Sequence, residues 1–151
     1  METSAYSSLI SIDSIRQAPP FRYVDEVIFF DPHQRCARLV LDANQQQCRY
    51  GDASALHSYL LIESMAQASG VLLSALTVGE GGGYLVGLEN AQLGVHFSDD
   101  AFAYPFFIDV AMTRANPPIF DFFVQINSHG DGIAQSMIQI MSKRTLKANF
   151  I

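Results

Sequence analysis

The sequence predicts an α+β domain in which an antiparallel sheet of about six strands wraps round one long helix. Three observations carry this prediction. Two strand-like segments open the chain, one almost continuous apolar stretch fills positions 55–78, and four more strand-like segments follow it. A chain of 151 residues has the length of one domain with a real core. We therefore expect a single domain over residues 1–151, with residues 1–19 as an N-terminal lead-in.

The first two strands are expected on either side of a short turn. Residues 22–30 (RYVDEVIFF) and 35–42 (RCARLVLD) have strand-like composition, and the turn signal Asp31-Pro32 lies between them. A strand that returns directly after such a turn pairs antiparallel with the one before it.

Four further strands are expected after the apolar stretch, over residues 83–93, 104–114, 119–128 and 133–143. The last two are joined by HGDG, which is a strong hairpin signal. Alternation in the segment 119–128 places one set of apolar residues on a single face: Phe120, Phe122, Val124 and Ile126. The sheet is therefore expected to pack one face inward.

The apolar stretch 55–78 is too long for a strand and contains no Pro and only one Gly, so we expect a buried helix. A membrane span is not expected, because Glu63, Gln67 and four serines interrupt the stretch. GEGGG (79–83) is read as a linker rather than a phosphate loop, since no GK[ST] follows it.

Composition narrows the classes of partner and compartment. The net charge of −6 and the scattered Lys and Arg residues argue against nucleic-acid binding. Cys36 and Cys48 lack redox or metal spacing and are read as free thiols. With no signal-peptide pattern at the start, we expect a cytoplasmic protein. An apolar content of 49% with only 16% charged residues makes an oligomer plausible.

The order of elements, together with PFRYVDEV (20–27) and LLIESMAQASGVLL (60–73), resembles the hot-dog fold of 3-hydroxyacyl-acyl carrier protein dehydratases. The residues that match the family pattern are Pro20, Phe21, Val24, Asp25, Val27, Glu63, Met65, Ala66 and Gln67. The resemblance implies removal of water from a 3-hydroxyacyl thioester on acyl carrier protein or coenzyme A, with no cofactor.

The resemblance breaks at the family's catalytic histidine, whose position 14 residues before Glu63 is occupied by Arg49. The family's Pro-Gly at the helix entrance is likewise replaced by His57-Ser58. This pattern is similar to the divergent dehydratase-like proteins of aryl polyene pathways, which also lack the usual histidine segment.

Dehydration needs a base for the C2 proton, an acid for the departing hydroxyl and donors that face the thioester oxygen. Glu63 fits the acid, because apolar surroundings favour a protonated carboxyl. Gln67 lies one turn further on the same helix face, where its amide can hold that carboxyl, and Gly70 continues the stripe. The spacing alone is equally consistent with a structural hydrogen bond in a core or across a dimer.

His57 is the best remaining base, although a histidine before a helix is often only a cap or a surface residue. Arg49 stays protonated, so it fits a phosphate or carboxylate contact, or a solvated loop charge, rather than a base. The residues that we expect to line the substrate-binding site are Ser58, Tyr59, Gly70, Gln67 and Arg49. The resemblance implies a dimer in which a loop of one subunit faces the helix glutamate of the other.

No metal site is expected, because His96, Asp99 and Asp100 lie close together on an expected loop and lack the spacing of a ligand set. Three functions follow from these observations. The first is a dehydratase. The second is a non-catalytic hot-dog subunit that binds acyl chains or pairs with a competent relative, as a homodimer or a heterodimer. The third is an acyl thioesterase, since one fold hosts several chemistries.

Overall fold

The computed structural model describes residues 24–41, 58–77, 83–93, 105–128 and 130–142. Within them the chain forms six strands and one helix, which follow the expected order. They are β1 (Glu26–Asp31), β2 (Cys36–Leu41), α2 (Ser58–Thr77), β3 (Gly83–Leu93), β4 (Phe106–Asn116), β5 (Ile119–Ser128) and β6 (Asp131–Ser142).

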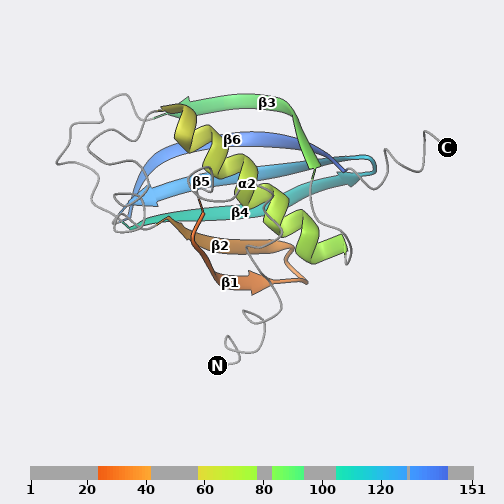
Figure 1. Cartoon of the computed structure of the whole chain (residues 1–151), viewed down its shortest axis with the longest axis horizontal. Helices are drawn as coiled ribbons and strands as arrows, with labels where there is room; N and C mark the ends of the chain where they lie inside the picture. Colours follow the sequence, from red (N-terminus) through yellow and green to blue (C-terminus); the bar gives the residue numbers. More distant parts are fainter. Residues whose placement is uncertain (1–23, 42–57, 78–82, 94–104, 129, 143–151) are drawn as a thin grey trace.

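All six strands belong to one antiparallel sheet with the order β1-β2-β4-β5-β6-β3. The helix α2 lies across one face of this sheet and contacts every strand from β2 to β6 (Figure 1). The predicted α+β class and the antiparallel sheet with one packed helix are therefore confirmed. How far the sheet wraps round the helix stays a prediction.

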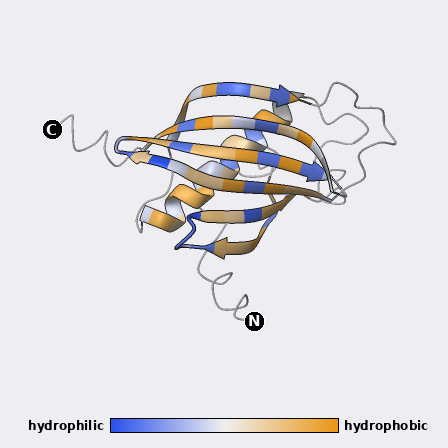
Figure 2. Cartoon of the chain, turned by 180° about the vertical axis from the view of Figure 1, so that it is seen from behind, coloured by the Kyte–Doolittle hydropathy of each residue, from blue (hydrophilic) through white to orange (hydrophobic). Residues whose placement is uncertain are grey.

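The core lies between α2 and the sheet face that the helix covers. The expected alternation in β5 is present, since Phe120, Phe122, Val124 and Ile126 are all buried. The same period of two runs through the paired strands β4 and β6, as the alternation of apolar and polar residues along the sheet shows in Figure 2. The strands β2, β4, β5 and β6 thus each have one inward face and one outer face, which points away from the helix.

The turn between β1 and β2 is built as the Asp31-Pro32 signal predicts. The Asp31 side chain accepts hydrogen bonds from the backbone N–H groups of His33 (2.8 Å) and Gln34 (3.0 Å). Arg35 completes the turn with a positive φ of 53°. The turn sets β1 and β2 in antiparallel register, with Asp31 opposite Cys36.

The helix buries one side against the sheet and leaves the other half-buried. Leu61, Met65, Ala68 and Leu72 are fully buried, whereas the side that carries Glu63 is not. Hydroxyl groups inside the helix donate to carbonyl oxygens four residues earlier, for example Ser69 to Met65 at 2.9 Å. No helix among the described residues is long and apolar enough to cross a membrane.

Candidate functional site

The candidate site begins with two polar side chains on α2. Gln67 Nε2 donates a hydrogen bond of 3.0 Å to Glu63 Oε1. The two residues lie four positions apart, which places them on one side of the helix, one turn from each other. Gln67 is only 6% exposed, so its amide is held by packing and presents a fixed donor to the carboxyl.

Glu63 is half-buried rather than buried within the single chain, which differs from the expectation of a carboxyl enclosed by apolar residues. The reason is its position on the less buried side of α2, next to Ala66 and Gly70. An almost uniformly apolar helix does not reveal from its sequence which side faces the sheet. The position leaves the Glu63 side chain partly open to a bound molecule or to a second subunit.

Gly70 adds open space beside this pair. Apart from its chain neighbours and the backbone of its own helix, a Cβ atom at Gly70 would meet no heavy atom of the described residues within 4 Å. The residue lies one turn after Ala66 and is half-buried. The Gly70 carbonyl accepts a hydrogen bond of 2.9 Å from Ser74 Oγ, so the backbone here has a fixed partner. The helix therefore offers a carboxyl, a fixed amide and unfilled room along one side.

The structure brings together Glu63, Gln67 and Gly70. Ser58 and Tyr59 form the first turn of α2, and only their backbone is described. His57 and Arg49 lie outside the described residues, so their predicted roles stay predictions.

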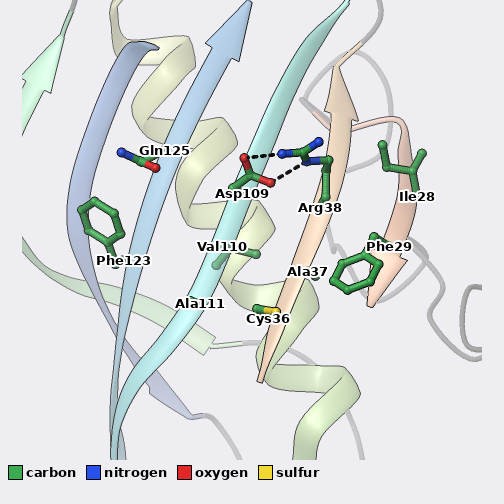
Figure 3. A pocket seen from close by; sticks show the side chains of 10 residues that line it. All are labelled: Ile28, Phe29, Cys36, Ala37, Arg38, Asp109, Val110, Ala111, Phe123 and Gln125. Carbon is green, nitrogen blue, oxygen red and sulfur yellow. Dashed lines mark hydrogen bonds and ion pairs between the residues drawn. The ribbon is translucent and has the colours of Figure 1, made fainter. Parts of the chain in front are cut away.

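A second feature lies on the outer face of the sheet and was not predicted from the sequence. A hollow of about 590 Å³ spans β1, β2, β4 and β5 on that face. At one end Arg38 donates to Asp109 through Nε (2.6 Å) and Nη2 (3.0 Å), as Figure 3 shows. Asn127 Nδ2 also donates to Asp109, at 3.1 Å. The hydrogen bond with Asp109 raises the pKa of Arg38 above its ordinary value.

The alternation of the sequence indicates that both residues face outward, but not that they pair. Arg38 and Asp109 each sit between buried neighbours in a strand, so both had to face outward. Their pairing depends on the register of β2 against β4, which a single sequence does not give. Among the described residues, no three His, Cys, Asp or Glu side chains lie close enough to hold a metal ion.

Comparison with solved structures identifies the fold. The chain is similar to "The Dehydratase Heterocomplex ApeI:P from Xenorhabdus doucetiae", with a TM-score of 0.68 and 16% identity over 91% of this chain and 95% of that one. A second similar structure is a putative thioesterase from Syntrophus aciditrophicus, with a TM-score of 0.63 and 10% identity over 89% and 93% of the two chains. The chain has a hot-dog fold.

A third similar structure is that of a hypothetical thioesterase from Streptococcus pneumoniae with coenzyme A, with a TM-score of 0.53 and 13% identity over 77% of this chain and 83% of that one. No family model matches the chain, and no curated protein matches it. Because the similar structures include a dehydratase complex and thioesterases, the hot-dog fold does not by itself choose between these activities.

Proposed function

We propose that this hot-dog chain is a dehydratase-like protein that removes water from a 3-hydroxyacyl thioester carried by acyl carrier protein or coenzyme A, in fatty acid or polyene biosynthesis. The observation that supports the proposal most is the Glu63–Gln67 hydrogen bond on the half-buried side of α2, with unfilled room at Gly70. We place the protein in the cytoplasm.

In the proposed reaction a base removes the C2 proton, the C3–O bond breaks, and a C2=C3 double bond forms. The departing hydroxyl leaves as water with a proton from Glu63. Gln67 fixes the plane of the carboxyl through Oε1, so the proton is presented in one direction. His57, one residue before α2, is the proposed base. Arg49 is proposed to contact the phosphate or an acidic surface of the carrier.

The proposed lining of the acyl site extends along α2 from its first turn. Ser58 and Tyr59 would contact the substrate at the first turn of α2, and Gly70 would leave room for the acyl chain. Nothing in this chemistry requires a metal or an organic cofactor.

Subunit pairing through β3 is part of the proposal. β3 stands at one end of the sheet order, and Tyr84, Leu85, Val86 and Leu88 are exposed by 39–50%. An exposed apolar edge strand is a template for pairing with another strand. We propose that β3 pairs with β3 of a second subunit, either a copy of this chain or a related hot-dog subunit.

The second candidate function is a non-catalytic subunit that binds acyl chains or completes a heterodimer with a competent dehydratase. Two observations favour it. Arg49 stands where the family pattern has its histidine, and one similar structure is a dehydratase heterocomplex by its own description. Thioester hydrolysis is a lesser alternative, supported by the similarity to the two thioesterases.

One experiment separates the three functions. The purified chain is incubated with a 3-hydroxyacyl thioester of acyl carrier protein and, separately, of coenzyme A, and the products are analysed by mass spectrometry. An enoyl thioester formed by the chain alone supports the dehydratase. Release of the free thiol supports the thioesterase. Unchanged substrate, with turnover only after a related hot-dog subunit is added, supports the non-catalytic subunit and contradicts the first proposal.

A further inference from the structure

The hollow on the outer face of the sheet has a floor of small side chains between larger apolar ones. Cys36 on β2 and Ala111 on β4 lie opposite each other in register and form this floor. Phe123 on β5 stands on one side of it, and Ile28 and Phe29 on β1 stand on the other (Figure 3). When one face of an antiparallel sheet covers the core, the other is normally polar. The hollow is therefore an apolar depression in a place where a polar surface is the rule.

A β-bulge builds the wall on β1. The register of β1 against β2 shifts between Val27 and Phe29. Ile28 and Phe29 are both exposed, by 39% and 37%, and both line the hollow. Alternation in a regular strand would turn one of them inward. Bulges are common next to functional sites, where they re-aim a side chain, and this one gives the hollow a wall that a regular strand would lack.

The polar end of the hollow is held in place by contacts within the chain. Arg38 donates to Asp109 through Nε and Nη2, and its guanidinium carbon lies 5.7 Å from the centre of the Phe107 ring. Asn127 Nδ2 donates to the same carboxylate at 3.1 Å. The hydrogen bonds to Asp109 use two of the five N–H donors of a guanidinium. The other donors of Arg38, which lines the hollow, are available to an oxygen atom of a bound molecule.

The charges around the hollow favour an uncharged ligand. Asp109 already neutralises Arg38 within the chain, and Asp31 lies opposite Cys36 in register, so a second carboxylate borders the floor. An anion on the floor would be repelled by both carboxylates. A cation would exchange its water for apolar side chains, which is costly. An uncharged molecule meets neither cost.

We propose that the outer-face hollow binds an uncharged, mostly apolar small molecule that carries one hydrogen-bonding oxygen. Its carbon skeleton lies on the Cys36–Ala111 floor, and its oxygen accepts a hydrogen bond from Arg38. The volume of about 590 Å³ falls within the range of about 300–1,000 Å³ that is usual for small-molecule sites, which are mostly apolar with a few placed polar groups. The hollow lies on the sheet face opposite α2, so this site is separate from the proposed acyl site.

The test uses 2-naphthol, an uncharged aromatic alcohol, as the probe and 2-naphthoate as its charged control. Cys36 reports binding at the floor itself in a Cys48→Ser variant, where it is the single cysteine. At one fixed pH near neutrality, saturating 2-naphthol is expected to slow the alkylation of Cys36 by iodoacetamide several-fold, because the probe covers the thiol. The same concentration of 2-naphthoate is expected to leave the rate unchanged. A parallel measurement in urea checks that neither probe consumes the reagent.

Variants of the walls show where the probe binds, all in the Cys48→Ser background. Phe29→Ser and Phe123→Ser each remove one wall, and both are expected to raise the concentration of 2-naphthol that gives half-protection of Cys36. Leu88→Ser is the matched control, because Leu88 is an apolar residue of β3 with a similar exposure of 39%. We expect Leu88→Ser to keep the half-protecting concentration of the parent. Circular dichroism shows whether each variant keeps its fold, and either wall variant suffices if the other unfolds.

The oxygen contact is tested by replacing Arg38 and Asp109 together with Leu, which removes the polar end without leaving a lone charge. Loss of a hydrogen bond to a charged group is expected to raise the half-protecting concentration by about tenfold. Absence of protection by 2-naphthol, or equal protection by 2-naphthoate, would overturn the proposal. So would a loss of protection in Leu88→Ser as large as in the wall variants, and an unchanged value in the double variant would refute the contact with Arg38. Failure of the proposed acyl chemistry would leave these results unaffected.

Discussion

The Cys36 thiol lies half-buried in the outer-face hollow, near two carboxylates. Loss of water around the thiol raises its pKa most, and the negative charges of Asp31 and Asp109 raise it further. Both causes make the negatively charged thiolate less stable than the neutral thiol. The folded chain therefore binds the thiol proton more tightly than the unfolded chain does, and its free energy of unfolding falls as the pH rises past the ordinary pKa of the thiol.

This shift is measurable in a Cys48→Ser variant, which leaves Cys36 as the single cysteine. The rate of alkylation is followed against pH for the folded variant and for the same variant in urea. We expect the midpoint of the folded protein at higher pH, because only the thiolate reacts. The midpoint pH is compared rather than the rate, because slower access of the reagent to the folded thiol lowers the rate at every pH without moving the midpoint. A folded midpoint equal to or below the unfolded one would contradict the expectation.

Glu63 and Gln67 show what the spacing of two residues in the sequence can predict and what it cannot. Their separation of four residues predicts a shared helix side, and the hydrogen bond of 3.0 Å confirms it. The exposure of Glu63 was not predictable, because it depends on which side of α2 meets the sheet. Arg38 and Asp109 illustrate the opposite limit: they are 71 residues apart, and only tertiary register brings them together.

At the level of elements, the helix and the strands were predictable within a few residues, because period and turn signals are local. β4 is expected at 104–114 and runs Phe106–Asn116, a shift of that kind. The bulge in β1 and the position of β3 beside β6 were not predictable. Both arise from pairings between distant segments.

The glycine in α2 gives a prediction that separates stability from function. Gly70→Ala should raise the free energy of unfolding by about 0.5–1 kcal/mol, because Gly is a poor helix former and a Cβ here meets nothing within 4 Å. Gly70→Leu should keep the fold but reduce turnover of long acyl substrates by filling that room. Urea unfolding and the product assay check the two effects. A Gly70→Ala variant less stable than the wild type would show that the room is absent.

Gly83, at the start of β3, should respond in the opposite direction. A Cβ there would collide with Ile140 Cγ2 and would lie 2.8 Å from the Met141 carbonyl oxygen. The backbone cannot yield cheaply, so Gly83→Ala is expected to lower the free energy of unfolding by about 1–3 kcal/mol. Urea unfolding measures this change in the free energy of unfolding, and Gly70→Ala, measured in the same way, is the matched control. An unchanged transition midpoint would refute the close approach of β3 and β6.

For the whole molecule, β3 is an edge strand of the sheet that the described residues form, and it carries exposed apolar side chains. A lysine on an edge strand opposes pairing with another strand. Val86 is 46% exposed, so Val86→Lys should spare the fold and halve the mass of the assembly in solution. Thr77→Lys, which adds the same charge at the exposed end of α2, serves as the control. An unchanged mass for Val86→Lys, with the wild type larger than a monomer, would exclude β3 as the pairing edge.

The central claim is that the Glu63 carboxyl protonates the departing hydroxyl of a 3-hydroxyacyl thioester. It is tested most directly by the rate of enoyl formation for the wild type and Glu63→Gln, with thermal unfolding and solution mass as controls for structure. Loss of a general acid lowers the rate by about 10²–10⁴-fold, and we predict a loss in that range with an unchanged melting temperature and mass. Enoyl formation by Glu63→Gln at the wild-type rate would contradict the account.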